Sequence, residues 1–228
     1  EPIFNCKGTK LTGSLFRPLL TTSDMQLLRL FMEGLDSIAY WYRSGRFIPG
    51  ILPIPVHAIA SSGYVDAMSE LILNSRLPVG LVSIGIQTMP ELDIADAYRE
   101  GLLRLRRLGV LLHFLKFTGA HEELQWISEF RLEGVHIDMS QLRERELADD
   151  VLTSLRQSPY SPTQIYASNV GLVKDLESAS TFIADHSYGG LMMSPVSRHQ
   201  MLQINDSRIA KAIFSLHPHQ HPNQNGDK

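Results

Sequence analysis

The sequence predicts a closed α/β barrel of the TIM (β/α)8 type, formed by one globular domain. Short apolar runs alternate with segments of helical period, the connections are short, and eight such runs fall within a little over 200 residues. Strands that alternate regularly with helices pair in parallel, with the helices packed outside the sheet. Eight strands in this length favour closure into a barrel, and an open doubly wound sheet is the alternative.

The expected strands are apolar runs of four to seven residues, bounded by polar or turn-forming residues. They cover about 2–6, 11–16, 51–56, 80–86, 110–115, 133–138, 163–168 and 187–192.

The expected helices lie between these strands. The longest, Ser23 to Tyr42, begins with the capping pair Ser23 and Asp24 and carries apolar residues at helical spacing. Leu216 to Lys228 is rich in His, Pro, Asn, Gln and Gly, so a barrel over 1–206 is expected to be followed by the end of the last helix and a disordered tail over 207–228. Further helices are expected at 62–74, 93–108, 122–130, 140–157, 172–183 and 197–205.

Composition excludes several classes of protein. The 21 basic and 24 acidic residues give a net charge of -3 without a long block of like charge, so no direct contact with nucleic acid is expected. Cys6 is the single cysteine and suits a reducing compartment. No apolar run reaches the roughly 20 residues needed to cross a bilayer. The chain begins at Glu1 without a start methionine. We therefore expect a cytoplasmic piece of a longer protein, which domains outside this sequence can tether to the inner membrane.

In a parallel barrel the reactive groups sit at the carboxyl ends of the strands. A hard divalent cation needs several carboxylate oxygens that converge there, and Asp138 is the nearest carboxylate. We therefore expect no metal, no cofactor and no catalytic residue. The residues expected at this end are Leu15, Pro55, Gly85, Leu115, His136, Ser168 and Gly189.

Three further groups have two interpretations each. His113 and His136 lie on adjacent strands, where they form either a zinc ligand pair or, as we favour, two hydrogen-bonded core histidines. The alternating histidines at 217–221 are expected to belong to a solvated tail rather than to a metal site. Arg104, Arg106 and Arg107 lie on an amphipathic helix, where an ordinary exposed face is favoured over a partner or RNA contact, with Leu102, Leu103, Leu105 and Leu108 expected to face the barrel.

The apolar, Pro-rich run 47–55 is expected to form the third strand and its lead-in. Any exposed part of it would form a hydrophobic patch of the kind that binds partners.

Several segments resemble the signatures of one family. Leu81 to Thr88 (LVSIGIQT) is similar to L-E-L-E-I-T-E, Leu108-Gly109-Val110 to the L-G-V before D-D-F-G, and His136-Ile137-Asp138 to K-I-D. Glu1-Pro2-Ile3 and Gly13 stand where the family has Q-P-I and G-x-E-A-L, and Ser194-Pro195 follows Gly190 as in Q-G-Y-x-F-S-x-P. The chain thus resembles the EAL domains, bacterial phosphodiesterases and receptors of cyclic di-GMP, over about residues 1–205. The spacing from Thr88 through Gly109 to Asp138 matches without gaps.

The resemblance also implies which functional positions have changed. Leu15, Pro55 and Gly85 stand in place of the metal-binding Glu, Asn and Glu, and Leu115-Lys116 replaces the tandem Asp pair. His136 replaces the catalytic Lys, Ser168 and Gly171 replace two Glu, and Gly189 replaces a Gln. Losing every anionic ligand removes the electrostatic reason for cations to bind and for water to be deprotonated. The resemblance therefore implies a degenerate domain without phosphodiesterase activity.

The favoured function is a non-catalytic regulatory domain in bacterial signalling that contacts another protein or an upstream domain, either GGDEF-like or a sensor. The first alternative is a metal-independent cyclic di-GMP receptor, with Lys116, His136 and Arg17 as phosphate donors. The second is an adaptor in RNA turnover, and an active hydrolase ranks last. The resemblance further implies that the short second strand is antiparallel to the others. It also implies a homodimer formed through the helices at 122–130 and 140–157.

Overall fold

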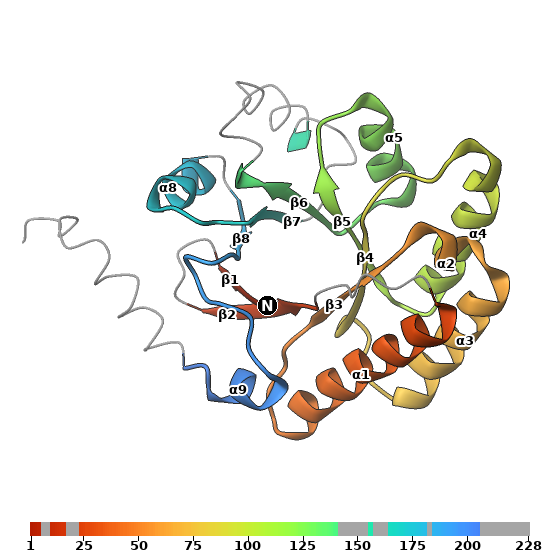
Figure 1. Cartoon of the computed structure of the whole chain (residues 1–228), viewed down its shortest axis with the longest axis horizontal. Coiled ribbons are helices and arrows are strands. Elements are labelled where there is room, and N and C mark those ends of the chain that lie inside the picture. The colour runs from red at the N-terminus through yellow and green to blue at the C-terminus, as the bar shows by residue number, and fades with distance from the viewer. Residues whose placement is uncertain (6–9, 17–22, 141–154, 157–163, 182–183, 206–228) are drawn as a thin grey trace, which may run out of the picture.

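The structure is a computed structural model that describes residues 1–5, 10–16, 23–140, 155–156, 164–181 and 184–205. Eight strands form a closed barrel in chain order, as predicted, so the open sheet is excluded (Figure 1). The strands are β1 Pro2–Asn5, β2 Leu11–Leu15, β3 Gly50–Ile54, β4 Val82–Ile86, β5 Leu111–Phe117, β6 Gly134–Asp138, β7 Gln164–Ser168 and β8 His186–Ser187. The helices are α1 Asp24–Arg43, α2 Val56–Ala60, α3 Ser62–Ser75, the 3₁₀ helix η1 Leu92–Ile94, α4 Ala95–Arg107, α5 His121–Phe130, α8 Val173–Thr181 and α9 Arg198–Gln203.

The predicted antiparallel pairing of the first two strands is confirmed. β1 runs antiparallel to both β2 and β8, while β2 is parallel to β3. Only five residues, 6–10, separate β1 from β2. A parallel connection needs a crossover of a dozen or more residues, which α1 supplies between β2 and β3. The strand that opposes its neighbours is therefore the first, and the second already has the direction of the others.

Side-chain alternation divides the barrel strands between two environments. Ile84, Leu112 and Val135 face outward and are fully buried under the helices. In Figure 1 helices α1 to α5 wrap around β3 to β6, and α8 lies beside β7 and β8. α1 buries Phe31, Ile38 and other apolar residues of one face. The residues of the opposite parity fill the barrel interior, where the candidate site lies.

The described elements correct three predictions and add one helix. The last strand ends at Ser187 instead of 192, because the backbone turns at Gly189, where φ is +148°. α2 was not predicted, since its five residues are too few to show a period. Ser23 is the N-cap of α1, but its side chain makes no capping hydrogen bond. On α4, Leu103 is 40% exposed while Leu102 and Leu105 are buried, because 100° per residue carries position 103 off the apolar face.

Some predictions fall outside the described residues. Of the helix expected at 140–157 only Ser140, Leu155 and Arg156 are described, and neither the tail 207–228 nor its histidines are described. None of the helices in the described ranges combines the length and the apolarity that a membrane span needs.

Two of the three arginines of α4, Arg104 and Arg106, bond to residues of neighbouring segments. Arg104 pairs with Asp66 of α3, and Arg106 pairs with Glu133 at 2.8 Å. Arg106 also donates to the carbonyl of Arg131 at 2.9 Å. These contacts support the prediction of an ordinary helix face.

Candidate functional site

Apolar side chains fill the middle of the barrel and extend to the carboxyl ends of β2 and β5. Ile3, Ile51, Tyr166 and Tyr188 form a buried cluster, against which the partly buried Leu15 and Leu115 pack. Leu15 and Leu115 come from β2 and β5. Two of the predicted mouth residues, Leu15 and Leu115, thus pack against the same apolar cluster. Their side chains carry no atom that could bind a metal ion.

Gly85 on β4 makes room for this packing. A Cβ atom at position 85 would lie 2.5 Å from Cδ1 of Leu115. The side chain of Leu115 therefore lies over the backbone of Gly85, in the space that a longer side chain at position 85 would need. The small residue and the large one form a complementary pair across two adjacent strands.

Three other predicted positions lie around the mouth. Pro55 follows β3 as the N-cap of α2, with its carbonyl accepting the amide of Ala58 at 3.1 Å. Gly189 follows β8, and a Cβ atom there would lie 2.3 Å from the amide nitrogen of Val170. Its positive φ of +148° independently favours glycine. Lys116 on β5 is exposed and is the cation among the predicted positions.

Asp138 at the end of β6 is held by its neighbours. Its Oδ1 accepts the backbone amide and the hydroxyl of Ser140, at 2.8 and 2.7 Å, and the amide of Asn169 at 3.3 Å. Within the described residues no group of three or more His, Cys, Asp or Glu is arranged to hold a metal ion. Among the described residues, Asp138 is therefore not joined by the further ligands that a divalent cation needs. Ser168, the predicted position on β7, donates instead to the carbonyl of Ile137 at 3.0 Å.

His136 and His113 meet inside the barrel, as predicted for adjacent strands. Nε2 of His136 lies 3.2 Å from Nδ1 of His113, and its Nδ1 lies 2.8 Å from the hydroxyl of Tyr188. Gly134 allows this approach, since a Cβ there would lie 2.2 Å from Nδ1 of His113. Both nitrogens of His136 are thus occupied by neighbours, as expected of core histidines rather than zinc ligands.

Tyr166 on β7 stacks between two imidazoles. Its ring lies parallel to that of His136, with centroids 4.3 Å apart, and stacks on His186 at 4.6 Å. The Tyr166 hydroxyl donates to Oε1 of Gln164 at 2.6 Å. Burial is the largest cause of the shifts in this stack: it lowers the pKa of His136 and of His186 and raises the pKa of Tyr166. These rings therefore form a neutral polar column within the barrel.

Sequence reasoning missed Tyr166, Tyr188 and His186. Tyr166 has the parity of Ser168 on its strand, so a strict two-residue period would have placed it inside the barrel. His186 was missed because β8 was expected to begin at 187, and Tyr188 could not be singled out on a strand whose expected length was wrong.

Two buried carboxylates, also unpredicted, organise loops at the carboxyl end. Oε2 of Glu123 accepts the amides of Thr118, Gly119 and Ala120 at 2.8 to 3.3 Å. Oδ2 of Asp175 accepts the amides of Gly171 and Leu172 at 2.9 and 2.8 Å. Gly171, which stands in place of a Glu of the family, thus donates its backbone amide to Asp175.

Solved structures of EAL domains align with most of this chain. Bd1971, in a form bound to cAMP and cyclic di-GMP, has a TM-score of 0.74 at 16% identity, over 89% of this chain and 62% of that one. The EAL domain of DcpA from Mycobacterium smegmatis has 0.71 at 16% identity, over 92% and 94%. The FimX EAL domain of Xanthomonas citri, in complex with cyclic di-GMP, has 0.69 at 11% identity, over 86% of each chain. No protein-family model and no curated protein matches the sequence.

These likenesses show that the chain has the fold of an EAL domain. It spans 62% of Bd1971, so that protein is longer than the aligned region.

Proposed function

We propose that this chain is a degenerate, non-catalytic EAL domain that regulates bacterial signalling by contacting another protein or another domain of its own chain. The observation that carries this proposal is the apolar packing of the mouth, where Leu15 and Leu115 join the cluster of Ile3 and Ile51. The aliphatic side chains of Leu15, Leu115, Ile3 and Ile51 offer a phosphodiester neither a hydrogen bond nor a counter-charge. In this proposal the barrel provides a binding surface for another protein or domain and catalyses no reaction.

The charge balance of the mouth supports the same proposal. Metal-assisted hydrolysis needs cations that polarise the phosphoryl group and lower the pKa of water. Asp138 is the carboxylate at the end of β6, and its Oδ1 already accepts three hydrogen bonds. His136, in place of the family's lysine, is fully buried. Burial is the main cause that holds its pKa well below the ordinary value, so it is neutral near pH 7.

The contact surface belongs to the same proposal. Phe47, in the lead-in to β3, is 71% exposed, and its ring meets the edge of Tyr42 at 5.4 Å. The isoleucines and the leucine of the run are buried, and its prolines are half-buried. The exposed part of the run 47–55 therefore centres on Phe47, a size suited to one anchor residue of a larger interface.

Hydrolysis of cyclic di-GMP in the presence of Mn²⁺ or Mg²⁺ tests the proposal. The intact chain is expected to release no linear product above the buffer rate, as measured by liquid chromatography. Turnover that disappears in Asp138→Asn or His136→Ala would refute the absence of catalysis.

A cyclic di-GMP receptor is the second candidate, favoured by the bound nucleotide in FimX and by exposed Lys116 beside the mouth. Isothermal calorimetry with and without Mg²⁺ separates the two functions. We expect no heat of binding, because the apolar layer offers no donor to phosphate. Micromolar binding that is lost in Lys116→Ala would establish the receptor instead.

Self-association through α5 and the segment 140–157 is part of the regulatory proposal. Sedimentation velocity at micromolar concentration is expected to show a dimer, and a strict monomer would remove this part alone.

A further inference from the structure

A cavity of about 180 Å³ lies at the end of the barrel opposite the mouth. Residues that begin strands line it, among them Leu111 on β5, Gln164 on β7 and His186 on β8, together with Gly80 just before β4. These are amino-terminal positions of parallel strands, so the cavity lies toward the end opposite the mouth. It shares Ile3, Ile51 and Tyr166 with the buried cluster against which Leu15 and Leu115 pack. Its polar residues Ser83, His113 and Gln164 do not belong to that cluster, so a ligand there is a separate proposal from the regulatory function.

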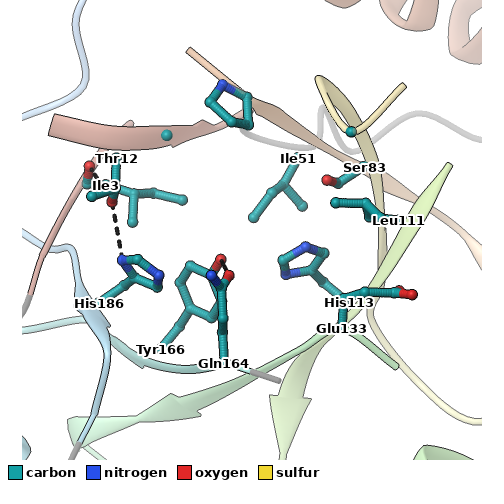
Figure 2. A pocket seen from close by; sticks show the side chains of 13 residues that line it. Ile3, Thr12, Ile51, Ser83, Leu111, His113, Glu133, Gln164, Tyr166 and His186 are labelled. Carbon is teal, nitrogen blue, oxygen red and sulfur yellow. Dashed lines mark hydrogen bonds between the residues drawn. The ribbon is translucent and has the colours of Figure 1, made fainter. Parts of the chain in front are cut away.

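The cavity has one apolar side and one polar side. Figure 2 shows Ile3 and Ile51 projecting from one side and His186, Tyr166, Gln164 and His113 from the other. Thr12 lies beside Ile3, and its hydroxyl is 3.1 Å from Nδ1 of His186. Ser83 of β4 lies next to Leu111 at one end of the view. A ligand that fits must therefore combine an apolar face with a polar edge.

Several polar groups of the lining have hydrogen-bonding capacity that no described residue uses. Ser83 is 2% exposed, and its hydroxyl has no partner among the described residues. His113 is 3% exposed and uses Nδ1 on His136, which leaves Nε2. Gln164 uses its amide oxygen on Tyr166, which leaves the amide nitrogen. Ser83 and His113 are buried and Gln164 is half-buried. Polar groups that line such a space normally find partners in protein or water, so a molecule with a matching donor and acceptor would take the place of water on these three groups.

The cavity carries no net charge of its own. Glu133, its one carboxylate, pairs with Arg106 at 2.8 Å and accepts the amide of Leu112 at 2.7 Å. Burial, reinforced by the nearby His186, lowers the pKa of His113 to about 3, so this imidazole is neutral near pH 7. A charged ligand would lose its hydration without a counter-charge, whereas a neutral ligand pays no such penalty.

The volume limits the ligand to one ring. A cavity of about 150 Å³ in another protein accepts benzene, and this cavity of about 180 Å³ is similar in size. The single-ring limit and the polar edge together exclude nucleotides and sugars with several rings.

We propose that this amino-terminal cavity is a binding site for a small, uncharged ring compound that carries a hydrogen-bond donor and an acceptor. The ring lies against Ile3 and Ile51, and its polar edge meets Ser83, His113 and Gln164. An azole or a pyrimidine has this combination of shape and polarity.

Pyrazole is a suitable probe, because it is neutral at pH 7 and carries a donor and an acceptor side by side. We expect titration of the ¹⁵N-labelled whole chain to give saturable shifts of the Ser83 and Leu111 amides and of the His113 ring nitrogens, with a Kd of about 1 mM, as befits a ligand of five heavy atoms. Pyrrolidine, a ring of equal size that is protonated at pH 7, is expected to give none. Absence of saturation with pyrazole, or equal binding of pyrrolidine, would overturn the proposal.

Variants at Ser83 locate the site. Ser83→Leu fills the cavity and is expected to abolish the pyrazole shifts, and Ser83→Ala removes one hydrogen bond and is expected to weaken binding about fivefold. Ser168→Ala is the control, because Ser168 is also a buried serine on a barrel strand and does not line the cavity. Unchanged affinity in Ser83→Ala, or equal weakening in Ser168→Ala, would contradict the assignment even if the leucine variant does not fold.

Discussion

The two ends of this barrel differ in how they use the space inside the strands. At the carboxyl end, Leu115 lies over Gly85 and apolar side chains meet. At the amino end, Ser83, His113 and Gln164 surround a cavity. TIM barrels usually place their chemistry at the carboxyl end and their structural residues at the other. Here the polar groups that line a cavity lie at the amino end, while Asp138 and Ser168 at the carboxyl end are held by hydrogen bonds to neighbouring residues.

The neutral histidines offer the strongest way to test the polar end. His113 has a pKa of about 3 in the folded chain, against an ordinary 6.5, so the unfolded state binds more protons below pH 6.5. Stability is therefore full above pH 6.5 and falls as the pH drops toward 3. His113 alone is expected to remove about 2 kcal/mol between pH 6.5 and 5. His136 shifts in the same direction and adds to the loss.

Urea unfolding measured at several pH values would show this loss. His113→Gln is the control, because its side chain does not titrate, and the slope with pH should become shallower. A slope identical to that of the unmodified chain would disprove the assignment to His113.

Gly134→Ala tests how tightly the polar column is packed. The added Cβ would lie 2.2 Å from Nδ1 of His113 and 2.9 Å from Cε2 of Tyr166, two rings that are held by further contacts. We expect the free energy of unfolding to fall by about 2 kcal/mol, as for overpacking of a well-filled core. Thermal unfolding followed by circular dichroism measures this change in the free energy of unfolding. A loss below a few tenths of a kcal/mol would show that the rings of His113 and Tyr166 move aside at little cost and are not tightly packed.

Gly85→Ala is the corresponding substitution at the apolar end, with a smaller expected effect. Its Cβ would meet the end of the flexible Leu115 side chain, which can change rotamer. We expect a loss of about 1 kcal/mol, and a smaller loss in the Leu115→Ala background, because the clashing atoms are absent there. A double-mutant cycle measures the coupling. Zero coupling would mean that Gly85 and Leu115 are not a complementary pair.

The sequence predicted the eight strands and a fold like that of EAL domains, because strand period and segment order are local properties. It also predicted the approach of His113 to His136, which needs only that their two strands be adjacent. It did not predict the short β8, since the turn at Gly189 depends on the backbone of Val170 lying against it. Nor did it predict the cavity, whose lining comes from residues 3 to 186.

The amino-acid sequence alone determined the alternation of strands and helices and the absence of carboxylates at Leu15, Pro55 and Gly85, because both are set residue by residue. The tertiary structure decided which side chains meet inside the barrel. Tyr166 stacks between His136 and His186 only because the register of β6, β7 and β8 aligns those three positions. Register and volume join residues distant in the chain, so no local pattern records them.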